Sequence, residues 1–253
     1  MPGCIAAKSN IVRSKQLEKP FLDLLTAYPE TSLPTMHRIR IHFSKTSAMR
    51  YTSHLDFHKT WERTFRRTGL PLVYSQGFNP HPKLQLACAL PLGFTSDCEL
   101  LDAWLDTEEL SDKEVLDRLE EAVPPGLQVH RINIVDLQAP ALQTRVLSAR
   151  YLATLLEPVP DLDQRVSGLL AARSLPRLRR GKAYDLRPLI EDLQPESPDE
   201  KGNQRLGMQL AARENNTGRP EEVLEALCLL PLGVRVHRTH LLLSPDPSPA
   251  MAD

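Results

Sequence analysis

The order of two hydrophobic periods along the chain constrains its fold more than any other feature. Apolar and polar residues alternate over 37–45 (HRIRIHFSK), which predicts a strand with Ile39, Ile41 and Phe43 on one face. A helical pattern over 53–69 follows. The same reasoning predicts further strands over 83–93, 98–106 and 127–136, with a helix over 111–123. The resulting order, β-α-β-β-α-β, is the ferredoxin-like split motif.

The second part of the chain repeats this order of elements. Its pattern predicts strands over 147–157, 204–214 and 233–243, helices over 161–173 and 219–230, and a hairpin turning at Gly181-Lys182. A polar loop over 194–203 reads as an insertion. We therefore expect an α+β fold of two tandem ferredoxin-like halves with mainly antiparallel sheets. The expected domains are a poorly ordered extension at 1–35, halves at 36–138 and 139–244, and a disordered tail at 245–253.

Composition excludes some classes of protein and leaves the charge pattern informative. No apolar run is long enough to span a membrane, and the N-terminus lacks the apolar core of a secretory signal. The four cysteines are scattered, which favours a reduced, cytoplasmic setting. The net charge is only −1, yet nine Lys and Arg face two acids over 38–83, and eleven acids face two bases over 97–121. Such segregation can produce a cationic surface on a nearly neutral molecule, although two solvated faces of opposite sign would read the same way.

The helix predicted over 53–69 has an apolar side and a basic side. Phe57, Trp61 and Phe65 lie at i, i+4 and i+8 and form one stripe for the core. The basic residues project from roughly the opposite side: Lys59, Arg63, Arg66 and Arg67. Guanidinium groups match phosphate oxygens in geometry and charge, so this side is a candidate phosphate-binding surface. Plain solvent exposure explains it equally well.

The first strand carries a second set of basic side chains. Arg38, Arg40 and His42 alternate with its buried residues. Because a split β-α-β sheet has helices on one face only, these side chains are expected on an open face. RNA-recognition domains stack bases on strand aromatics at that face, and no such aromatics occur here. The face suits phosphate contacts, docking of an acidic protein, or cover by the second half.

The loop YSQGFNPHPK, residues 74–83, is stiffer than a simple connection requires. Pro80 and Pro82 fix their own φ angles and push Asn79 and His81 toward extended geometry. A preordered loop loses little entropy on binding. We interpret it as a recognition loop, with a rigid connector pinned by its aromatics as the alternative. The candidate binding residues in it are Tyr74, Phe78, Asn79, His81 and Lys83.

Signals for catalysis and for metals are weak. His54, His58 and Glu62 share helical spacing, but no third ligand is fixed by spacing, and Glu62 can pair with Arg66 instead. The chain has no GxSxG, Walker or HExxH motif and no CxxxCxxC cluster motif. We predict no catalytic residue, no metal and no cofactor on this chain, and therefore no enzyme acting on its own.

Several long motifs closely resemble the bacterial radical SAM-linked protein family over about residues 37–243. The motifs are Arg50-Tyr51, Ser53-His54-Leu55-Asp56, Arg66-Arg67 and Gly77-Phe78-Asn79-Pro80-His81-Pro82-Lys83. This family is a domain of unknown function fused to, or encoded beside, a cobalamin-binding radical SAM protein. The resemblance implies such a protein as partner and, from neighbouring genes, a role around ribosomal RNA. Any radical chemistry would belong to the partner, since this chain lacks the cluster cysteines.

Three hypotheses follow. The first is an accessory module that presents RNA or a ribonucleoprotein to the radical SAM partner. The second is a scaffold that docks this partner without nucleic acid, and the third is an enzyme using His54, Asp56 and His81. The residues assigned to RNA or ligand binding are Arg38, Arg40, Arg50, Tyr51, His54, Asp56, Arg66, Arg67, Tyr74, Phe78, Asn79, His81 and Lys83.

Overall fold

A computed structural model describes residues 35–108, 111–229 and 233–245 of the chain. The extension predicted over 1–35 and the tail predicted over 245–253 lie outside these residues, apart from Thr35 and Pro245. The described residues form a mixed α+β fold with a largely antiparallel sheet, as the sequence predicts. No helix among them is long and apolar enough to cross a membrane.

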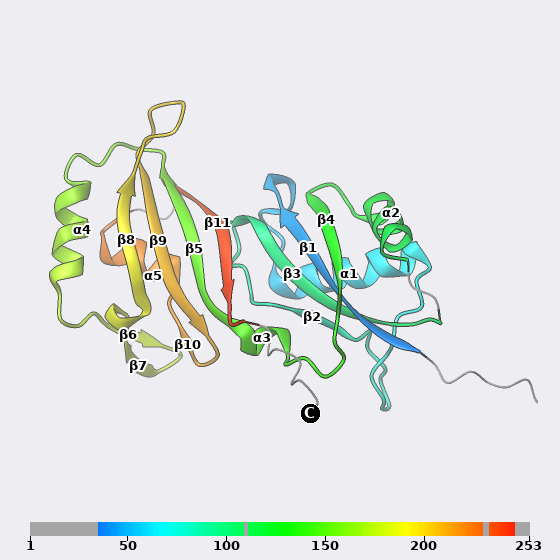
Figure 1. Cartoon of the computed structure of the whole chain (residues 1–253). Helices are drawn as coiled ribbons and strands as arrows, with labels where there is room; N and C mark the ends of the chain where they lie inside the picture. Colours follow the sequence, from blue (N-terminus) through cyan, green and yellow to red (C-terminus); the bar gives the residue numbers. More distant parts are fainter. Residues whose placement is uncertain (1–34, 109–110, 230–232, 246–253) are drawn as a thin grey trace, which may run out of the picture. The chain divides into compact units, whose positions relative to one another are not determined.

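The first part of the fold contains four strands and two α-helices in the described range (Figure 1). They are β1 (Met36–Lys45), α1 (His54–Thr68), β2 (Leu84–Leu86), β3 (Thr95–Asp106), α2 (Asp112–Ala122) and β4 (Leu127–Val135), with a 3-10 turn, η2 (Ser47–Met49), after β1. The strands lie in the order β4-β1-β3-β2, and all three neighbouring pairs are antiparallel. The strand predicted over 83–93 is much shorter, because only β2 pairs with β3.

The second part has the same order of main strands and helices, with a hairpin and a short strand in addition. Its elements are α3 (Leu142–Arg145), β5 (Val146–Leu155), α4 (Leu162–Ala171), β6 (Pro176–Arg179), β7 (Lys182–Asp185), η3 (Arg187–Leu189), β8 (Ile190–Glu196), β9 (Arg205–Arg213), β10 (Asn216–Thr217), α5 (Pro220–Ala226) and β11 (Val234–Leu243). Four of these strands lie in the order β11-β5-β9-β8. The hairpin β6–β7 turns at Arg180-Gly181, one residue earlier than predicted, where both residues have positive φ.

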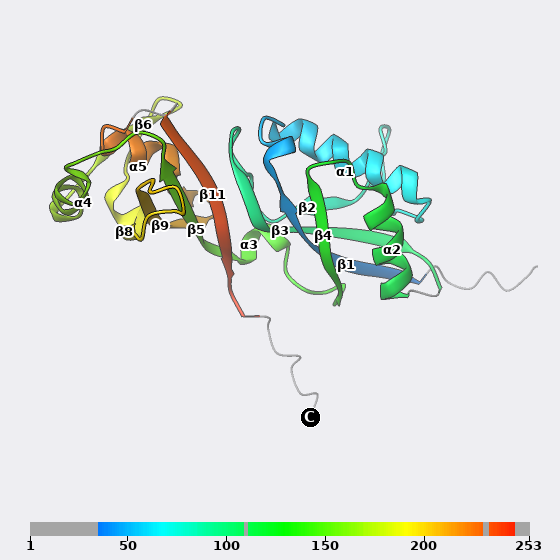
Figure 2. The same ribbon diagram turned by 90° about the horizontal axis from the view of Figure 1, so that it is seen from above.

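One short contact joins the two parts into a single sheet. β11 pairs with β3 in parallel, through His237 with Thr95 and Arg238 with Ser96. Among the described residues this makes one nine-stranded sheet, and β6 and β7 form a separate two-stranded sheet. We call this junction of β3 and β11 the seam. It lies midway along the sheet (Figures 1 and 2).

Each part has its own apolar core, and the periodicity explains both. Ile39, Ile41 and Phe43 of β1 are fully buried against the stripe of α1, where the ring of Trp61 meets Phe43 edge-on at 4.8 Å. Truncating a buried tryptophan of this kind to alanine costs about 3–5 kcal/mol. A second cluster packs α4 and α5 on β5, β8 and β9. The helices of each part therefore cover one face of its strands.

The caps of α1 fix where this helix begins and ends. Ser53 accepts a hydrogen bond from the backbone N–H of Asp56, and its hydroxyl donates to the Asp56 carboxylate at 2.7 Å. Gly69 ends the helix in the left-handed region, with φ of 67°. The first residue of α1, His54, is thereby held at a defined place next to the seam.

Candidate functional site

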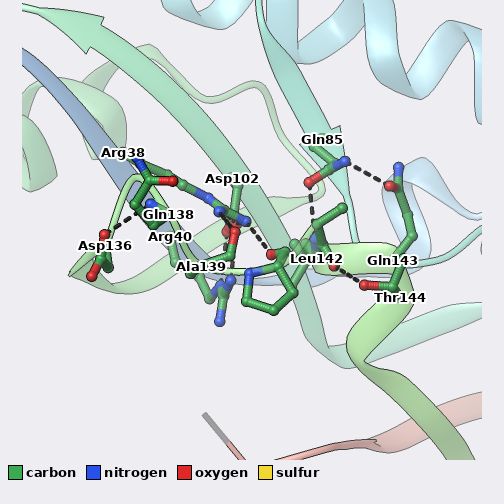
Figure 3. Close-up of polar contacts among 12 residues, drawn as sticks. Arg38, Arg40, Gln85, Asp102, Asp136, Gln138, Ala139, Leu142, Gln143 and Thr144 are labelled. Carbon is green, nitrogen blue, oxygen red and sulfur yellow. Dashed lines mark hydrogen bonds and ion pairs between the residues drawn. The ribbon is translucent and has the colours of Figure 1, made fainter. Parts of the chain in front are cut away.

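The sequence predicts that Arg38 and Arg40 lie on an open face of β1, and for these two residues the prediction is wrong. Arg38 and Arg40 are buried, with 2% and 6% of their surface exposed. Both guanidinium groups bind the carboxylate of Asp102 on β3, each with a contact of 2.7 Å (Figure 3). We call these three residues the arginine cluster. Its guanidinium groups are buried and bound to a carboxylate of the fold itself, so they are not available to phosphates.

The linker between the two parts is the physical reason for this burial. Arg38 also donates to the backbone carbonyls of Ala139 and Pro140, at 2.6 and 2.9 Å, where the linker crosses this face of the sheet (Figure 3). Carbonyl groups that leave water need donors, and a guanidinium supplies several at once. Gln85 fastens the same linker by accepting from the backbone N–H of Leu142.

His42, on the same face of β1, is half-buried. Burial, followed by the neighbouring charges of Arg131 and Arg40, lowers the pKa of His42 from 6.5 to about 4. The imidazole is therefore neutral at pH 7.

The outer side of α1 does carry free cationic groups. Lys59, Arg63 and Arg66 are exposed, and no carboxylate of the described residues pairs with them. Arg67 differs, because it donates to the Ala122 carbonyl at the end of α2. Glu62 pairs with His58 at 3.1 Å rather than with Arg66.

The loop over 74–83 forms a short hairpin beside β3. Tyr74 bridges to Pro82, and Ser75 and His81 exchange hydrogen bonds at 2.8 and 3.0 Å. Phe78 is fully exposed at the tip, so packing of this ring does not pin the loop. Asn79 and His81 are exposed as well.

Lys83 closes the base of this hairpin, where its ammonium group lies 4.4 Å from the centre of the Trp104 ring. Arg38 lies against the same ring, at 5.0 Å. Lys83 is thus held on the protein by an aromatic contact as well as by its backbone hydrogen bond to Val73.

The motif residues at the start of α1 do not converge on one reaction centre. Tyr51 and His54 are exposed, Arg50 is half-buried, and Asp56 is used in the helix cap. His54 lines a cavity at the seam that neither Asp56 nor His81 lines. The arrangement proposed for an enzyme using these three residues is therefore not what the structure brings together.

The cavity beside the seam, which we call the seam cavity, has a volume of about 540 Å³. Its walls come from both parts of the fold, from the start of α1 and the segment after β2 on one side, and from β5, β9, β10 and the start of α5 on the other. The wall includes His54, Cys88, Leu90, Pro91, Tyr151 and Arg219. A pocket of this size and mixed polarity is typical of small-ligand sites.

A small inner chamber of about 10 Å³ shares His54, Cys88 and Leu90 with the seam cavity. Lys45 and Glu99, each 2% exposed, line this chamber. The fully buried Arg238 of β11 lies behind Glu99, with 3.5 Å between Nη1 and Oε1. We call Lys45, Glu99 and Arg238 the seam cluster.

The hydrogen bonds of the seam cluster are incomplete. Lys45 Nζ donates to the Thr52 carbonyl at 3.2 Å, while Glu99 Oε1 and Arg238 Nε have no hydrogen-bond partner among the described residues. Arg238 also donates to Cys88 Sγ and to the Ala89 carbonyl. Buried polar groups without partners are uncommon and mark sites that ask for an explanation.

Burial dominates the titration of this region. It lowers the pKa of the Lys45 ammonium despite the opposing charge of Glu99, and the partial desolvation of His54, followed by the neighbouring His58, lowers the pKa of this imidazole. It also raises the pKa of the Cys88 thiol, against the nearby guanidinium of Arg238. Groups with shifted pKa values around a cavity are typical of functional sites.

Sequence reasoning missed the seam cluster, although a signal was present. Lys45 continues the buried stripe of β1, Glu99 precedes the stripe of β3, and Arg238 follows Val236 on β11. Each stripe becomes charged at the end that reaches the seam. A charged residue in register with buried ones is the pattern that would have identified these positions.

Comparison with known families shows the family to which the chain belongs. The chain belongs to the DUF2344 family, described as uncharacterised proteins conserved in bacteria, whose model matches residues 38–220. No curated protein matches it. Within the described residues, no group of three or more His, Cys, Asp or Glu side chains is arranged to hold a metal ion.

Solved structures resemble the chain only distantly. An unknown protein from Galdieria sulphuraria is 14% identical, with 83% of this chain and 100% of that chain covered and a TM-score of 0.25. A chain of a Cbf5-Nop10-Gar1 complex is 9% identical with a TM-score of 0.41, over 80% of this chain and 48% of its own length. The acetolactate synthase small subunit from Thermotoga maritima is 11% identical with a TM-score of 0.26, over 84% and 98%. This chain spans about half the length of the Cbf5-complex chain.

Proposed function

We propose that this chain is a non-catalytic accessory protein that binds RNA or a ribonucleoprotein for a radical SAM partner. One observation carries the RNA-binding part. Lys59, Arg63 and Arg66 form an exposed cationic stripe on α1, at i, i+4 and i+7, with no carboxylate of the described residues to neutralise them. A stripe of this kind attracts phosphates and releases counterions when they bind.

The stripe is rigid, which favours binding over simple solvation. Phe57, Trp61 and Phe65 hold the opposite side of α1 in the core. The backbone of the helix is therefore already ordered, and only the long side chains lose freedom on binding. Exposed aromatic rings are available in the loops, since 78% of Tyr51 and all of Phe78 are accessible. Such rings stack on unpaired bases without reading their sequence.

The partner is proposed from the resemblance of the sequence motifs, and the fold from the order of the strands. The motifs at Arg50-Tyr51 and 77–83 resemble the radical SAM-linked family, which supports a cobalamin-binding radical SAM protein as partner. The spatial orders β4-β1-β3-β2 and β11-β5-β9-β8 are equivalent, because in each part the fourth main strand lies beside the first, followed by the third and the second. They support two tandem ferredoxin-like halves.

The test is RNA affinity measured by fluorescence anisotropy across a series of salt concentrations. The double variant Arg63→Glu/Arg66→Glu is expected to bind a single-stranded RNA at least about tenfold more weakly, and to lower the salt slope by about 1.4. The matched control Arg173→Glu/Lys182→Glu makes the same charge change at exposed positions outside α1. Equal losses in both variants, or an affinity that ignores salt, would remove this proposal.

A scaffold that docks the radical SAM enzyme without nucleic acid is a second candidate. Tyr51, Leu55 and Leu92 are exposed by 78%, 73% and 61%, and a hydrogen bond from Gly93 to the Arg50 carbonyl joins two of their segments. Exposed apolar side chains suit protein contacts. The acidic segment over 97–121 is a weaker docking surface than its composition indicates, because Glu99 and Asp102 are buried. Co-purification of the enzyme after nuclease treatment favours the scaffold, and its loss favours RNA.

A further inference from the structure

We infer that the seam cavity is a nucleotide-binding site, with the base directed toward Lys45 and Glu99 and the phosphate at the mouth. The inference deepens the proposed function and rests on it only for the source of the nucleotide. The cavity offers three kinds of contact in sequence, namely polar groups at its inner end, apolar walls, and, in the part of the chain that the structure describes, an unpaired arginine at its opening.

The inner end holds a donor and an acceptor whose hydrogen bonds are incomplete, and Glu99 Oε1 is held by an ion pair with Arg238 at 3.5 Å. Lys45 Nζ carries three N–H groups, of which the Thr52 carbonyl accepts one, and Glu99 Oε1 accepts none from the described residues. A neighbouring donor and acceptor complement the edge of a nucleobase, which carries carbonyl or ring nitrogen acceptors beside N–H donors. The chamber between them has room for about one water molecule, so an exocyclic group of the base or one bridging water fits there.

The walls suit a flat apolar body. Leu90 and Pro91 line one side, and Tyr151 and Ala212 line the other. Leu90 and Tyr151 are buried, so both are held in place by the surrounding core. The volume of about 540 Å³ lies in the range that holds ligands of nucleotide size.

The mouth presents one cationic side chain without an ion-pair partner in the described part of the chain. Arg219 is exposed there and has no carboxylate partner among the described residues, while Arg179 is neutralised by Glu222 at 2.6 Å. The positive end of the fifteen-residue helix α1 reaches the same mouth through Ser53 and His54. Farther in, the seam cluster holds two cationic side chains against one carboxylate, which adds to the positive potential.

A carboxylate at the mouth has a separate use. Glu221 lines the cavity beside Arg219 and is exposed. It would accept a hydrogen bond from a sugar hydroxyl, whereas a second phosphate at this place would meet its charge. The site therefore favours a mononucleotide unit over a nucleoside polyphosphate. That unit comes from free nucleotide or from a nucleotide extruded from an RNA strand, and both present the same chemistry.

The experiment is calorimetric titration of the full chain with UMP, CMP, AMP and GMP, and separately with inorganic phosphate. We expect at least one mononucleotide to bind more tightly than phosphate, and Lys45→Met and Glu99→Gln to weaken it by about tenfold or more each. Ala89→Phe, at an exposed wall position, fills the cavity without touching the core, so it keeps the test valid if a buried variant fails to fold. Glu62→Gln on α1 is the matched control and should bind as the parent does.

The outcomes separate this inference from the proposed function. Mononucleotide binding that survives Arg63→Glu/Arg66→Glu supports the seam site even if those variants bind RNA normally. Competition of a single-stranded oligonucleotide with the mononucleotide assigns the source to RNA, and its absence assigns the source to free nucleotide. The inference is overturned if no mononucleotide binds at 10 mM (roughly the limit of a weak specific site), if phosphate alone binds equally well, or if Ala89→Phe has no effect.

Discussion

The molecule contains two buried clusters that have the same formal charges but differ in their hydrogen bonding. The arginine cluster and the seam cluster each combine two cationic side chains with one carboxylate. In the arginine cluster, Asp102 accepts four hydrogen bonds, and two linker carbonyls accept two further hydrogen bonds from Arg38. In the seam cluster, Glu99 Oε1 and Arg238 Nε make no hydrogen bond with the described residues, and the ion pair between Glu99 and Arg238 is longer, at 3.5 Å.

The difference separates a charge cluster whose hydrogen bonds are saturated from one whose hydrogen bonds are not. Burial alone does not distinguish Asp102 from Glu99, since at most 2% of either residue is exposed. Saturation does, because a buried polar group without a partner costs free energy that a purely structural cluster has no reason to carry. Four predictions follow, in order of expected size.

Asp102→Asn should give the largest loss of stability. It leaves two buried guanidinium groups without a counterion, so we expect the free energy of unfolding to fall by about 3–5 kcal/mol. Urea unfolding followed by circular dichroism measures this. Asp117→Asn, exposed on α2, is the matched control and should change little. A loss as small as that of the control would mean that the arginine cluster does not hold the linker.

Removing one cation from each cluster should change the free energy of unfolding by different amounts. Arg40→Met deletes two hydrogen bonds to Asp102 and should cost about 2–3 kcal/mol. Lys45→Met leaves Glu99 balanced by Arg238, so its stability should stay within about 1 kcal/mol of the parent. The same urea experiment checks both variants. Equal costs would contradict the difference in saturation on which the comparison depends.

Acid should destabilise the β1 face through His42. Its folded-state pKa of about 4 lies below the unfolded value of 6.5, so its contribution is complete above pH 6.5 and is lost as pH falls toward 4. The expected loss is up to about 2 kcal/mol, allowing for partial exposure. Unfolding at several pH values, in the parent and in His42→Gln, measures the part that this imidazole contributes. A variant with the same pH dependence as the parent would rule out His42 as its source.

The exposed stripe of α1 should matter least for stability. Arg63→Glu/Arg66→Glu changes no described ion pair, so the free energy of unfolding should move by no more than about 0.5 kcal/mol. Thermal unfolding checks this in the samples used for RNA binding. A larger loss would show that the stripe has a structural role, and a change in RNA affinity would then need that explanation first.

The sequence predicts the elements well because their signals are local. The alternation over 37–45 and the caps at Ser53 and Gly69 place β1 and α1 with small errors at their ends. The burial of Arg38 could not be predicted from the local sequence, because it depends on a linker about a hundred residues away that supplies the Ala139 carbonyl. A polar residue that alternates with buried ones reads as exposed until its neighbours across the sheet are known.

The candidate site was predicted in part. His54 was selected from a motif and does line the seam cavity. The residues facing it come from β5, β9, β10 and the start of α5, which are far from His54 in the chain, and no local period reports such a contact. The two prolines predict a stiff recognition loop over 74–83; the structure shows a hairpin with Phe78 exposed, and what it binds stays a prediction.

The seam has a consequence for the order in which the protein is made. Thr95 and His237 are separated by 142 residues, so β3 must wait for most of the chain to be synthesised before β11 reaches it. Until then, the strands destined for the junction present unsatisfied backbone edges, which are prone to pair with other chains. The junction of β3 and β11 is accordingly completed late, and a nascent chain that already displays the cationic helix does not yet contain it.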